Sequence, residues 1–221
     1  MGLEVVQPDP QLRVTEIFFS LQGESTRQGL PCAMVRLTGC NLRCTWCDTE
    51  YSFHGGQTRS ISDIMQDVAA FDVRRVEITG GEPLLQKGVS ALADRFLAEG
   101  YEVLCETSGE RNIDILPAGV HRIVDIKCPG SGESERNDWG NIDRLRAGDE
   151  VKFVVADRTD FDWSTEVVRK YALLSRVPVH VSPVWKKVEP ADVAEWILAS
   201  GLDLRLSLQQ HKLLWGETPG R

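Results

Sequence analysis

Hydrophobic and polar positions divide the first forty residues into two strand-like segments separated by a turn. Strands are predicted at 14–21 and 31–37, and Gln22-Gly23-Glu24-Ser25 interrupts the pattern between them. Arg36 is the only charged residue in the second segment. An arginine in an otherwise apolar strand either extends its head group to solvent or holds an anion, so Arg36 is a candidate binding residue.

The rest of the chain alternates between strand and helix patterns. A helix is predicted at 60–71, where Ser60 is the expected N-cap and Asp63 occupies the third helical position. The later predicted strands are 75–79, 101–105, 122–126, 150–155, 179–181 and 205–208, and the later predicted helices are 85–99, 161–174 and 190–199. This alternation predicts an α/β fold with about six parallel strands after an N-terminal hairpin, fewer than the eight of a closed barrel.

One segment, 130–149, is polar, has no apolar period and contains Gly130, Gly132 and Gly140, so a long functional loop or a short helix is expected there. The chain shows no internal repeat and no low-complexity segment. With 221 residues it has the length of one domain, and residues 1–221 are interpreted as a single domain.

Composition narrows the functional classes. The chain is 42% hydrophobic and 26% charged, and no apolar run approaches the ~20 residues that span a membrane. Residues 1–11 contain neither a basic region nor an apolar stretch, so a secretory signal is not expected and the cytoplasm is the predicted location. The net charge of −8 argues against a nucleic-acid binder that neutralises phosphates, which favours a small substrate.

Three of the six cysteines, Cys40, Cys44 and Cys47, fall within eight residues. Thiolates are soft metal ligands, and a short loop can bring three of them to one metal centre. The spacing C-x3-C-x2-C supplies three sulfurs, whereas a structural zinc site or a fully ligated iron-sulfur cluster needs four. The pattern therefore favours a metal centre with one position left for another ligand.

Other interpretations of the cysteines remain open at this stage. Cys44 and Cys47 could form a redox dithiol, although Cys40 would then be unexplained. A structural zinc ion could use Cys32 or His54 as its fourth ligand. The three scattered thiols, Cys32, Cys105 and Cys128, lie in apolar or strand-like contexts and are interpreted as packed side chains.

A second motif, Ile78-Thr79-Gly80-Gly81-Glu82-Pro83, ends a predicted strand about thirty residues after the cysteines. Glycines at a strand end allow backbone amides to approach a ligand, and an acid there can hold an ammonium group. Together, and in this order, the two motifs resemble the radical S-adenosylmethionine (SAM) superfamily.

Further motifs narrow the resemblance to one family. They are Phe19-Ser20-Leu21-Gln22-Gly23-Glu24, Val35-Arg36-Leu37, Trp46-Cys47-Asp48-Thr49 and Gln209-Gln210-His211-Lys212. The chain is similar in these to the 7-carboxy-7-deazaguanine synthase family. The resemblance implies a partial (β/α) barrel, typically in a homodimer, and a lyase reaction. That reaction converts 6-carboxy-5,6,7,8-tetrahydropterin to 7-carboxy-7-deazaguanine with loss of ammonia, in queuosine and deazapurine biosynthesis, with an electron donor such as a flavodoxin.

The resemblance also implies which residues hold the cofactors. Cys40, Cys44 and Cys47 would bind three irons of a [4Fe-4S] cluster, and the amino and carboxylate groups of SAM would chelate the fourth iron. The other implied SAM-binding residues are Gly80, Gly81 and Glu82 at the methionine amino group, Ser108 at the ribose or carboxylate, and Lys127 and Ser182 along the same surface. For Lys127, a buried ion pair with Asp125 or Glu106 is the alternative.

On the substrate side, Glu24 would accept the two parallel donors of the 2-amino-4-oxo pterin edge, and Arg36 would hold the substrate carboxylate. Gln22, Thr79 and His211 would add polar contacts. The alternatives are a solvated turn for Gln22 and Glu24 and a surface position for His211. The chain departs from the family at Ser25, where glycine is common, and at Ser108, where asparagine is common; both keep small, polar side chains, and function should be retained.

A magnesium ion is the third implied cofactor. Thr49 matches the family position that binds Mg²⁺ next to the substrate carboxylate, and a single threonine oxygen is sufficient because Mg²⁺ keeps several water and substrate ligands. The alternative is that Asp48 and Thr49 only cap the turn.

Two rival functions share some of these motifs. A glycyl-radical enzyme activase of the same superfamily would keep both the cysteines and the glycine motif, but it would act on a large protein partner. A non-catalytic zinc or iron-sulfur binding module would keep only the metal site.

Overall fold

Nine strands form a single sheet in the computed structural model, which describes residues 9–218 and 220. The strands are β1 Gln11–Leu21, β2 Pro31–Leu37, β3 Gln57–Ser60, β4 Arg75–Gly80, β5 Glu102–Thr107, β6 His121–Asp125, β7 Glu150–Val155, β8 Val179–Pro183 and β9 Arg205–Leu206. They lie in the order β3-β1-β2-β4-β5-β6-β7-β8-β9. Strand β1 is antiparallel to both neighbours, and all pairs from β2 to β9 are parallel.

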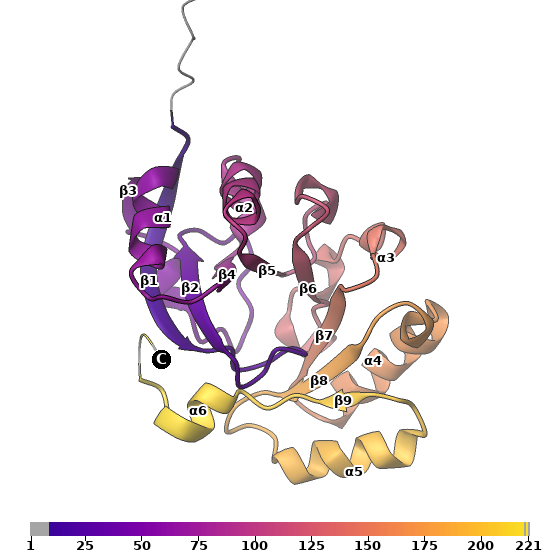
Figure 1. The fold of residues 1–221 in the computed structure, drawn as a ribbon. Coiled ribbons are helices and arrows are strands. Elements are labelled where there is room, and N and C mark those ends of the chain that lie inside the picture. The colour runs from indigo at the N-terminus through magenta and orange to yellow at the C-terminus, as the bar shows by residue number, and fades with distance from the viewer. Residues whose placement is uncertain (1–8, 219, 221) are drawn as a thin grey trace, which may run out of the picture.

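Helices cover the outer side of this curved sheet (Figure 1). They are α1 Ile61–Ala69, α2 Val89–Ala98, α3 Asn141–Arg144, α4 Arg158–Lys170, α5 Pro190–Ser200 and α6 Gln210–Trp215. Since β3 and β9 are not paired with each other, the sheet stays open. This confirms the predicted partial barrel with six parallel strands after the hairpin. Within the described part of the chain, no helix has the length and apolar character required to cross a membrane.

Several predicted elements have the expected bounds because their local signals are strong. Strands β2 and β7 match 31–37 and 150–155. Helix α1 follows the predicted N-cap: Ser60 Oγ accepts the Asp63 N–H at 3.1 Å, and the Asp63 carboxylate accepts the Ser60 N–H at 3.3 Å. This reciprocal capping box satisfies two backbone donors at the helix start.

Other elements differ from the prediction for identifiable reasons. Helix α2 begins at Val89 instead of 85 because a 3-10 turn, Pro83–Leu85, is followed by extended backbone at Gln86. Helix α4 begins three residues early, where Asp157 accepts the Asp160 N–H at 3.0 Å. Strand β3 and helix α6 were not predicted, since the one depends on pairing with β1 and the other on docking against a distant turn. Residues 1–8, part of the segment expected to lack a secretory signal, lie outside the described residues.

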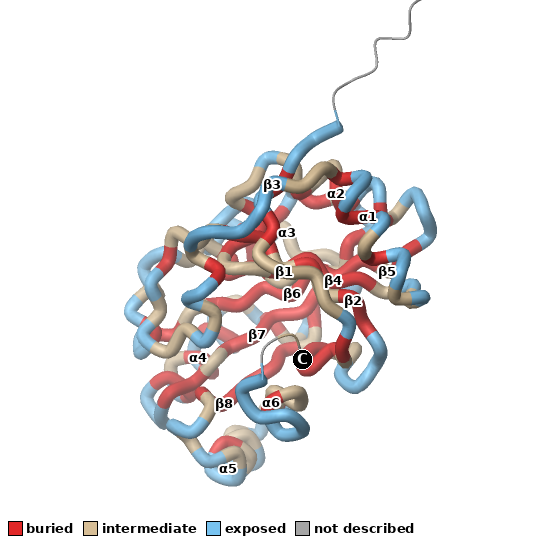
Figure 2. Tube along the Cα trace, turned by 90° about the vertical axis from the view of Figure 1, so that its left-hand side faces the viewer, coloured by how far each residue is buried: buried red, intermediate tan, exposed pale blue. Residues whose placement is uncertain are grey.

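The sheet has one apolar and one polar face because side chains alternate along each strand. On β4, Val76 and Ile78 are fully buried in the layer shared with α2, whose Leu92 and Phe96 belong to the same core. The alternate residue on β4, Glu77, points to the concave side and is also buried. Figure 2 shows the central strands buried as a whole. A polar interior on the concave side follows from this alternation.

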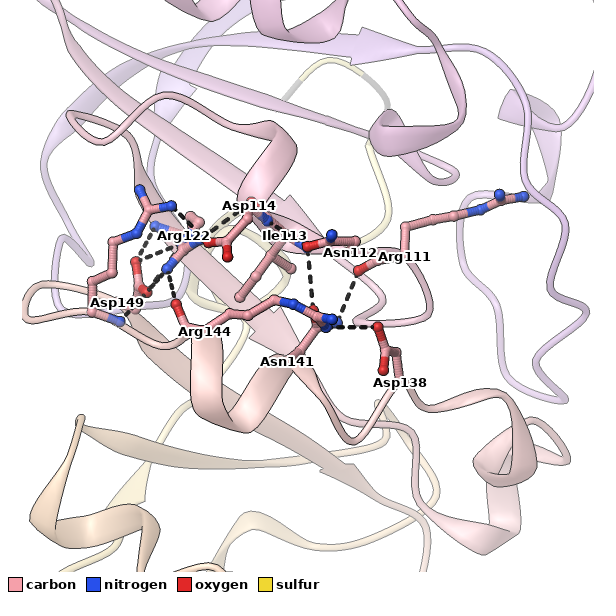
Figure 3. Close-up of polar contacts among 10 residues, drawn as sticks. Arg111, Asn112, Ile113, Asp114, Arg122, Asp138, Asn141, Arg144 and Asp149 are labelled. Carbon is pink, nitrogen blue, oxygen red and sulfur yellow. Dashed lines mark hydrogen bonds and ion pairs between the residues drawn. The ribbon is translucent and has the colours of Figure 1, made fainter.

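Beside β6 the outer layer lacks a long helix, and a buried arginine holds the neighbouring chain segments together there (Figure 3). Arg122 on β6 is fully buried and binds Asp149 through Nε at 3.0 Å and through Nη2 at 2.5 Å. It also donates to Asp114 Oδ1 at 3.1 Å and to the carbonyls of Ile113 and Arg144. A buried charge is tolerated only when paired and hydrogen-bonded, and these partners come from both crossovers that flank β6.

The segment expected as a loop or short helix, 130–149, contains short 3-10 turns and the four-residue helix α3. Asn141 fixes it to the turn after β5 by donating to the carbonyls of Gly109 and Arg111 at 2.9 and 2.8 Å. The segment is therefore tied to the sheet by hydrogen bonds instead of by an apolar helix face.

Candidate active site

A cavity of about 520 Å³ lies at the carboxyl ends of the parallel strands. It is lined by all but one of the residues proposed from the sequence for cofactor, substrate and metal binding: Gln22, Glu24, Arg36, Cys40, Cys44, Cys47, Thr49, Thr79, Gly80, Gly81, Ser108, Lys127, Ser182 and His211. The exception is Glu82. Gln22 and His211, which are 189 positions apart, come together because α6 docks on the β1–β2 turn, where Gln210 donates its N–H to the Gly23 carbonyl at 3.0 Å.

The cysteine loop is held in place by the segment that follows β6. Thr45 donates its N–H to the carbonyl of Ser131 at 3.0 Å and its hydroxyl to the carbonyl of Gly130 at 2.9 Å. Arg43 donates its N–H to the Glu133 carboxylate at 2.6 Å. The polar segment 130–149 therefore supports the cysteine loop.

The three thiols suit a cluster better than a single ion. Across the residues that the structure describes, no three His, Cys, Asp or Glu side chains converge on one metal position. The two candidate fourth zinc ligands are unsuitable, because Cys32 is fully buried in β2 outside the cavity lining and His54 is exposed. Cys105 and Cys128 are also buried, as expected for packed thiols. Three separated sulfurs fit a cluster that offers each cysteine its own iron.

Burial also determines the protonation of the unligated thiols. It raises the pKa of Cys40 and raises that of Cys44 to about 11, with Lys127 opposing the shift at Cys44. A backbone N–H, that of Leu42, points at Cys40 Sγ at 3.4 Å, which favours a thiolate. A bound metal would therefore be required to keep these sulfurs deprotonated near neutral pH.

The two sequence motifs touch each other through their backbones. A Cβ at Gly81 would lie 2.5 Å from the carbonyl oxygen of Gly39 and 2.6 Å from Cys40 Cβ. The Glu82 N–H donates to the same Gly39 carbonyl at 2.9 Å. Glycine at position 81 thus allows the cysteine loop to pack directly on the end of β4.

Glu82 itself lies behind the cavity wall. It is fully buried, and its carboxylate accepts hydrogen bonds from Thr107 Oγ1 at 2.8 Å, Ser108 N at 2.7 Å, Ser108 Oγ at 2.6 Å and Leu84 N at 2.9 Å. Charge-assisted hydrogen bonds of this number fix the carboxylate firmly. Glu82 therefore holds the end of β5, including Ser108, against the end of β4.

Lys127 lines the cavity and also forms an ion pair, with Nζ 2.8 Å from Asp125 Oδ2. Both interpretations of this lysine from the sequence are thus compatible with its position. Although burial alone would lower the pKa of Lys127, the Asp125 carboxylate and the neighbouring Cys44 raise it, so the ammonium group stays charged. Asp125 Oδ1 is buried and has no hydrogen-bond partner in the described part of the chain.

A buried lysine on β7 organises the opposite side of the cavity. Lys152 Nζ lies 2.6 Å from Glu24 Oε2, contacts Glu106 Oε1, and lies 3.9 Å from Asp125 Oδ2. Burial would lower the pKa of Lys152, but the carboxylates of Glu106 and Glu24 raise it well above its usual value. The Glu24 backbone N–H donates to Gln22 Oε1 at 2.6 Å. Glu24 is therefore held at both its backbone and its side chain, unlike a solvated turn residue.

The turn that carries Gln22 and Glu24 is anchored to the start of β7 by a later residue, Thr26. Thr26 donates its N–H to both oxygens of Glu150 at 3.1 and 2.9 Å. Ser25 adopts φ 53°, in the left-handed region where glycine is favoured. The glycine expected here from the sequence resemblance would adopt this conformation without steric cost, whereas serine adopts it less readily.

Arg36 is fixed on the cavity wall by one edge of its guanidinium. Its Nε donates to Glu16 Oε1 at 2.7 Å, and Tyr51 donates its hydroxyl to the same oxygen at 2.7 Å. Burial would lower the pKa of Arg36, but Tyr51 and Glu16 raise it. Neither Nη group donates to a partner in the described residues, so Arg36 retains donors for an anionic ligand.

The C-terminal helix α6 closes the cavity beside the cysteine loop. His211 lies on this helix, not on the last strand, and fits against Gly23, where a Cβ would be 2.3 Å from His211 Nδ1. Burial lowers the pKa of His211, with Glu24 opposing the shift. His211 is therefore a cavity residue that is neutral near pH 7.

Asp48 is occupied by α6, whereas Thr49 is not. Lys212 Nζ pairs with Asp48 Oδ2, and Gln209 Nε2 donates to the same oxygen at 3.3 Å. Burial would raise the pKa of Asp48, but Lys212 lowers it. Thr49 lines the cavity and makes no side-chain cap to the 3-10 turn that follows it. Its Oγ1 lies 3.7 Å from Cys47 Sγ, a weak contact that leaves the oxygen able to bind a ligand. Asp48 is therefore the residue that α6 holds, and Thr49 is not.

Sequence reasoning missed several cavity residues: Glu77, Glu106, Asp125, Lys152, Trp185 and Glu217. Glu77 and Lys152 carried a usable signal, because each is a charged side chain inside a predicted strand, as Arg36 is. Glu217 lies in the C-terminal tail, whose participation the family motifs did not indicate.

Comparisons with known proteins agree with this geometry. The profile of the radical SAM superfamily matches residues 34–124. A 7-carboxy-7-deazaguanine synthase of Koribacter versatilis is 46% identical, covering 95% of this chain and 100% of its own length, and that of Chlorobaculum tepidum is 42% identical, covering 92% and 94%. The crystal structure of QueE from Escherichia coli superposes with a TM-score of 0.72 at 23% identity, covering 91% of this chain and 95% of that one.

Proposed function

The chain belongs to the 7-carboxy-7-deazaguanine synthase family of the radical SAM superfamily. On this premise, we propose which residues of its cavity bind the cofactors and which bind the substrate. The enzyme converts 6-carboxy-5,6,7,8-tetrahydropterin to 7-carboxy-7-deazaguanine with loss of ammonia, in queuosine and deazapurine biosynthesis. The observation that carries this function is the 46% identity to a synthase over that relative's full length. We also propose that residues 1–221 act as a single catalytic domain, which the one continuous sheet supports.

Superfamily membership implies a [4Fe-4S] cluster and SAM. When bound, they supply the hydrogen-abstracting chemistry that starts the rearrangement. We propose that Cys40, Cys44 and Cys47 hold the cluster, and that Gly80 and Gly81 meet the methionine amino group through their backbones. Glu82 would act from behind, because its carboxylate is already occupied by Thr107 and Ser108.

The remaining proposed SAM contacts come from the ends of the next strands. Ser108, Lys127 and Ser182 line the cavity at the ends of β5, β6 and β8. Lys127 would offer a permanent positive charge to the carboxylate of SAM, and Ser182 would offer a hydroxyl. Ser108 Oγ donates its proton to Glu82, so it would accept a hydrogen bond from the ribose. Their positions on rigid strand ends favour a fixed geometry for the cofactor.

On the substrate side, we propose that Glu24 accepts the two donors of the pterin edge with its two carboxylate oxygens, since Lys152 uses only part of the acceptor capacity of Oε2. Arg36 would bind the substrate carboxylate through its Nη groups, since its Nε is already paired with Glu16. Gln22, Thr79 and His211 would add polar contacts, with His211 as a neutral partner. The arrangement selects a small anionic heterocycle.

Magnesium is proposed as a further cofactor, with Thr49 as its protein ligand. Two features support this: the hydroxyl of Thr49 is not used to cap the turn, and Lys212 holds Asp48 aside. Mg²⁺ is commonly held by one or two protein oxygens together with substrate and water, so one hydroxyl next to the substrate carboxylate is sufficient.

Three wider features are also proposed. An electron donor such as a flavodoxin would reduce the cluster, because the chemistry requires one electron. A homodimer is supported by exposed leucines on α5 and α6, of which Leu198 is 74% and Leu213 54% exposed. A reducing location such as the cytoplasm suits six free cysteines.

Anaerobic incubation tests the function. Reconstituted protein, SAM, a reductant and 6-carboxytetrahydropterin should yield 7-carboxy-7-deazaguanine and ammonia in equal amounts. Cleavage of SAM without any deazapurine would instead favour the activase interpretation. A colourless protein that binds zinc and never cleaves SAM would contradict the enzymatic function altogether.

A further inference from the structure

Glu77 is a buried carboxyl group in the substrate half of the cavity to which the proposed reaction assigns no role. It lies on the cavity face of β4, two residues before Thr79, and it is 1% exposed. Its strand neighbours Val76 and Ile78 face the apolar core, so the side chain of Glu77 cannot turn away from the cavity without disrupting β4.

The charges around Glu77 are unbalanced. Lys152 on β7 is already shared by Glu24 from the β1–β2 turn and Glu106 from β5, with Asp125 from β6 at 3.9 Å. In the described part of the chain, Glu77 forms no ion pair. Cys32 on β2 also faces Glu77, and burial keeps this thiol protonated by raising its pKa. A negative charge on Glu77 would therefore be a further buried carboxylate without a cation of its own.

This environment favours the neutral carboxylic acid. Burial and then the charge of Glu106 raise the pKa of Glu77 to about 8, although the hydrogen bond from Gln22 and the charge of Lys152 oppose the shift. Burial likewise raises the pKa of Glu106, where Lys152 opposes the shift most strongly. Of the two glutamates, Glu106 has the direct ion pair, so Glu77 is the one that keeps its proton.

Glu77 is connected to the pterin-binding carboxylate through one side chain. Gln22 Nε2 donates to Glu77 Oε2 at 2.8 Å, and Gln22 Oε1 accepts the Glu24 N–H at 2.6 Å. These two bonds decide which way the Gln22 amide points, and they hold the backbone of Glu24. A glutamine amide with only one of the two partners could rotate and release Glu24.

From these contacts we infer that Glu77 is a positioning residue for substrate recognition and that it works in its protonated form. Its carbonyl oxygen orients Gln22, which in turn places Glu24 for the pterin edge, while its proton keeps the charge balance around Lys152. The inference rests on the proposed role of Glu24. Ionisation of Glu77 would add a carboxylate beside Glu24 and Glu106, and repulsion would displace the turn.

Replacement of Glu77 by its neutral isostere, glutamine, tests whether the residue acts as a protonated acid or as a carboxylate. Glu77→Gln keeps a carbonyl acceptor for Gln22 and cannot ionise, so kcat/KM for the pterin should stay within about threefold of wild type at neutral pH. Glu77→Ala removes the acceptor and should raise KM about 10- to 100-fold, with a smaller effect on kcat. Glu166→Gln, at an exposed position on α4, is the matched control and should leave both values unchanged.

The pH profile supplies the second readout. Wild-type kcat/KM should fall above about pH 8, by up to about tenfold per pH unit, as Glu77 ionises. Glu77→Gln should lose this alkaline decline, and Glu166→Gln should keep it. A Glu77→Gln protein as impaired as Glu77→Ala at neutral pH, or one with the wild-type alkaline decline, would overturn the inference.

A measurement without turnover keeps this test separate from that of the function. Infrared difference spectra of the substrate-free protein at neutral pH should contain the C=O band of a protonated carboxylic acid, and Glu77→Gln should lack it. If wild type shows the band but neither binds nor converts the pterin, the proposed function fails while the protonation of Glu77 stands. If the band is the same in both proteins, Glu77 is ionised and the inference is wrong.

Discussion

The cofactor half and the substrate half of the cavity are built in different ways. The cofactor half consists of two continuous motifs whose backbones touch, with the Glu82 N–H on the Gly39 carbonyl and no room for a Cβ at Gly81. The substrate half consists of single side chains from the β1–β2 turn, β2, β4, β5, β7 and α6, grouped around Lys152.

Because the two halves are built differently, we expect mutations to impair ligand binding in each half for a different reason. Where backbones pack directly, a single added methyl group forces a displacement, because the contacting atoms cannot rotate away. Where charges share one lysine, the shape can tolerate change but the charge balance cannot. Steric changes should therefore impair SAM binding, and changes in charge should impair pterin binding.

The largest effect is expected for the cluster ligands. Cys44→Ala should lose the cluster, with iron content and SAM cleavage falling to background, because two thiolates cannot hold a cubane that needs three. Cys105→Ala, a fully buried thiol on β5 outside the cavity lining, is the control and should retain both. Substantial SAM cleavage by Cys44→Ala would show that the ligand assignment is wrong.

The next largest effect should follow removal of the central charge on the substrate side. Lys152→Met leaves Glu24 and Glu106 without their shared cation, and kcat/KM for the pterin should fall about 10²- to 10³-fold. Lys170→Met, at the exposed end of α4, should have no effect on the same assay of deazapurine formation. If Lys152→Met remains within a few-fold of wild type, charge balance does not organise this half.

A smaller but selective effect is expected at the junction of the two motifs. Gly81→Ala places a methyl group against Gly39 and Cys40, so we expect SAM cleavage to slow about 10- to 100-fold. Gly88→Ala offers the comparison, because its nearest neighbour is the flexible side chain of Leu12 at 3.3 Å. Equal rates of SAM cleavage for both variants would mean that the cysteine loop can move to accommodate the added methyl group.

The smallest effect concerns α6. Lys212→Met removes the partner that lowers the pKa of Asp48, so the stabilisation from this pair, present above the usual aspartate pKa and lost on acidification, should disappear. The Mg²⁺ concentration for half-maximal activity should rise about three- to tenfold because Asp48 is no longer held aside from Thr49. An unchanged Mg²⁺ requirement would show that α6 does not influence Mg²⁺ binding at Thr49.

Much of the cofactor half was predictable from the sequence because its functional residues lie close together in two short motifs. The spacing of Cys40, Cys44 and Cys47 limits the site to three sulfurs, and the glycines at 80 and 81 end a predicted strand. Their direct contact also follows from topology, since β2 and β4 are adjacent parallel strands whose ends meet.

The substrate half was only partly predictable, because its key contacts join residues far apart in the chain. Lys152 and Glu77 are visible as charges inside apolar strands, but their partners depend on strand order and register. Helix α6 is six residues long, too short to be stable alone, and it forms against Gly23 and Asp48. Pairwise charge balance of this kind emerges only when the sheet is assembled.

The most direct test of the two-part cavity is a crossed measurement of affinity. Equilibrium binding of SAM and of 6-carboxytetrahydropterin would be measured anaerobically on cluster-loaded Gly81→Ala and Lys152→Met. We predict that Gly81→Ala weakens SAM about 10-fold or more and leaves the pterin within about threefold, and that Lys152→Met does the reverse. Parallel loss of both ligands in both variants would contradict the account.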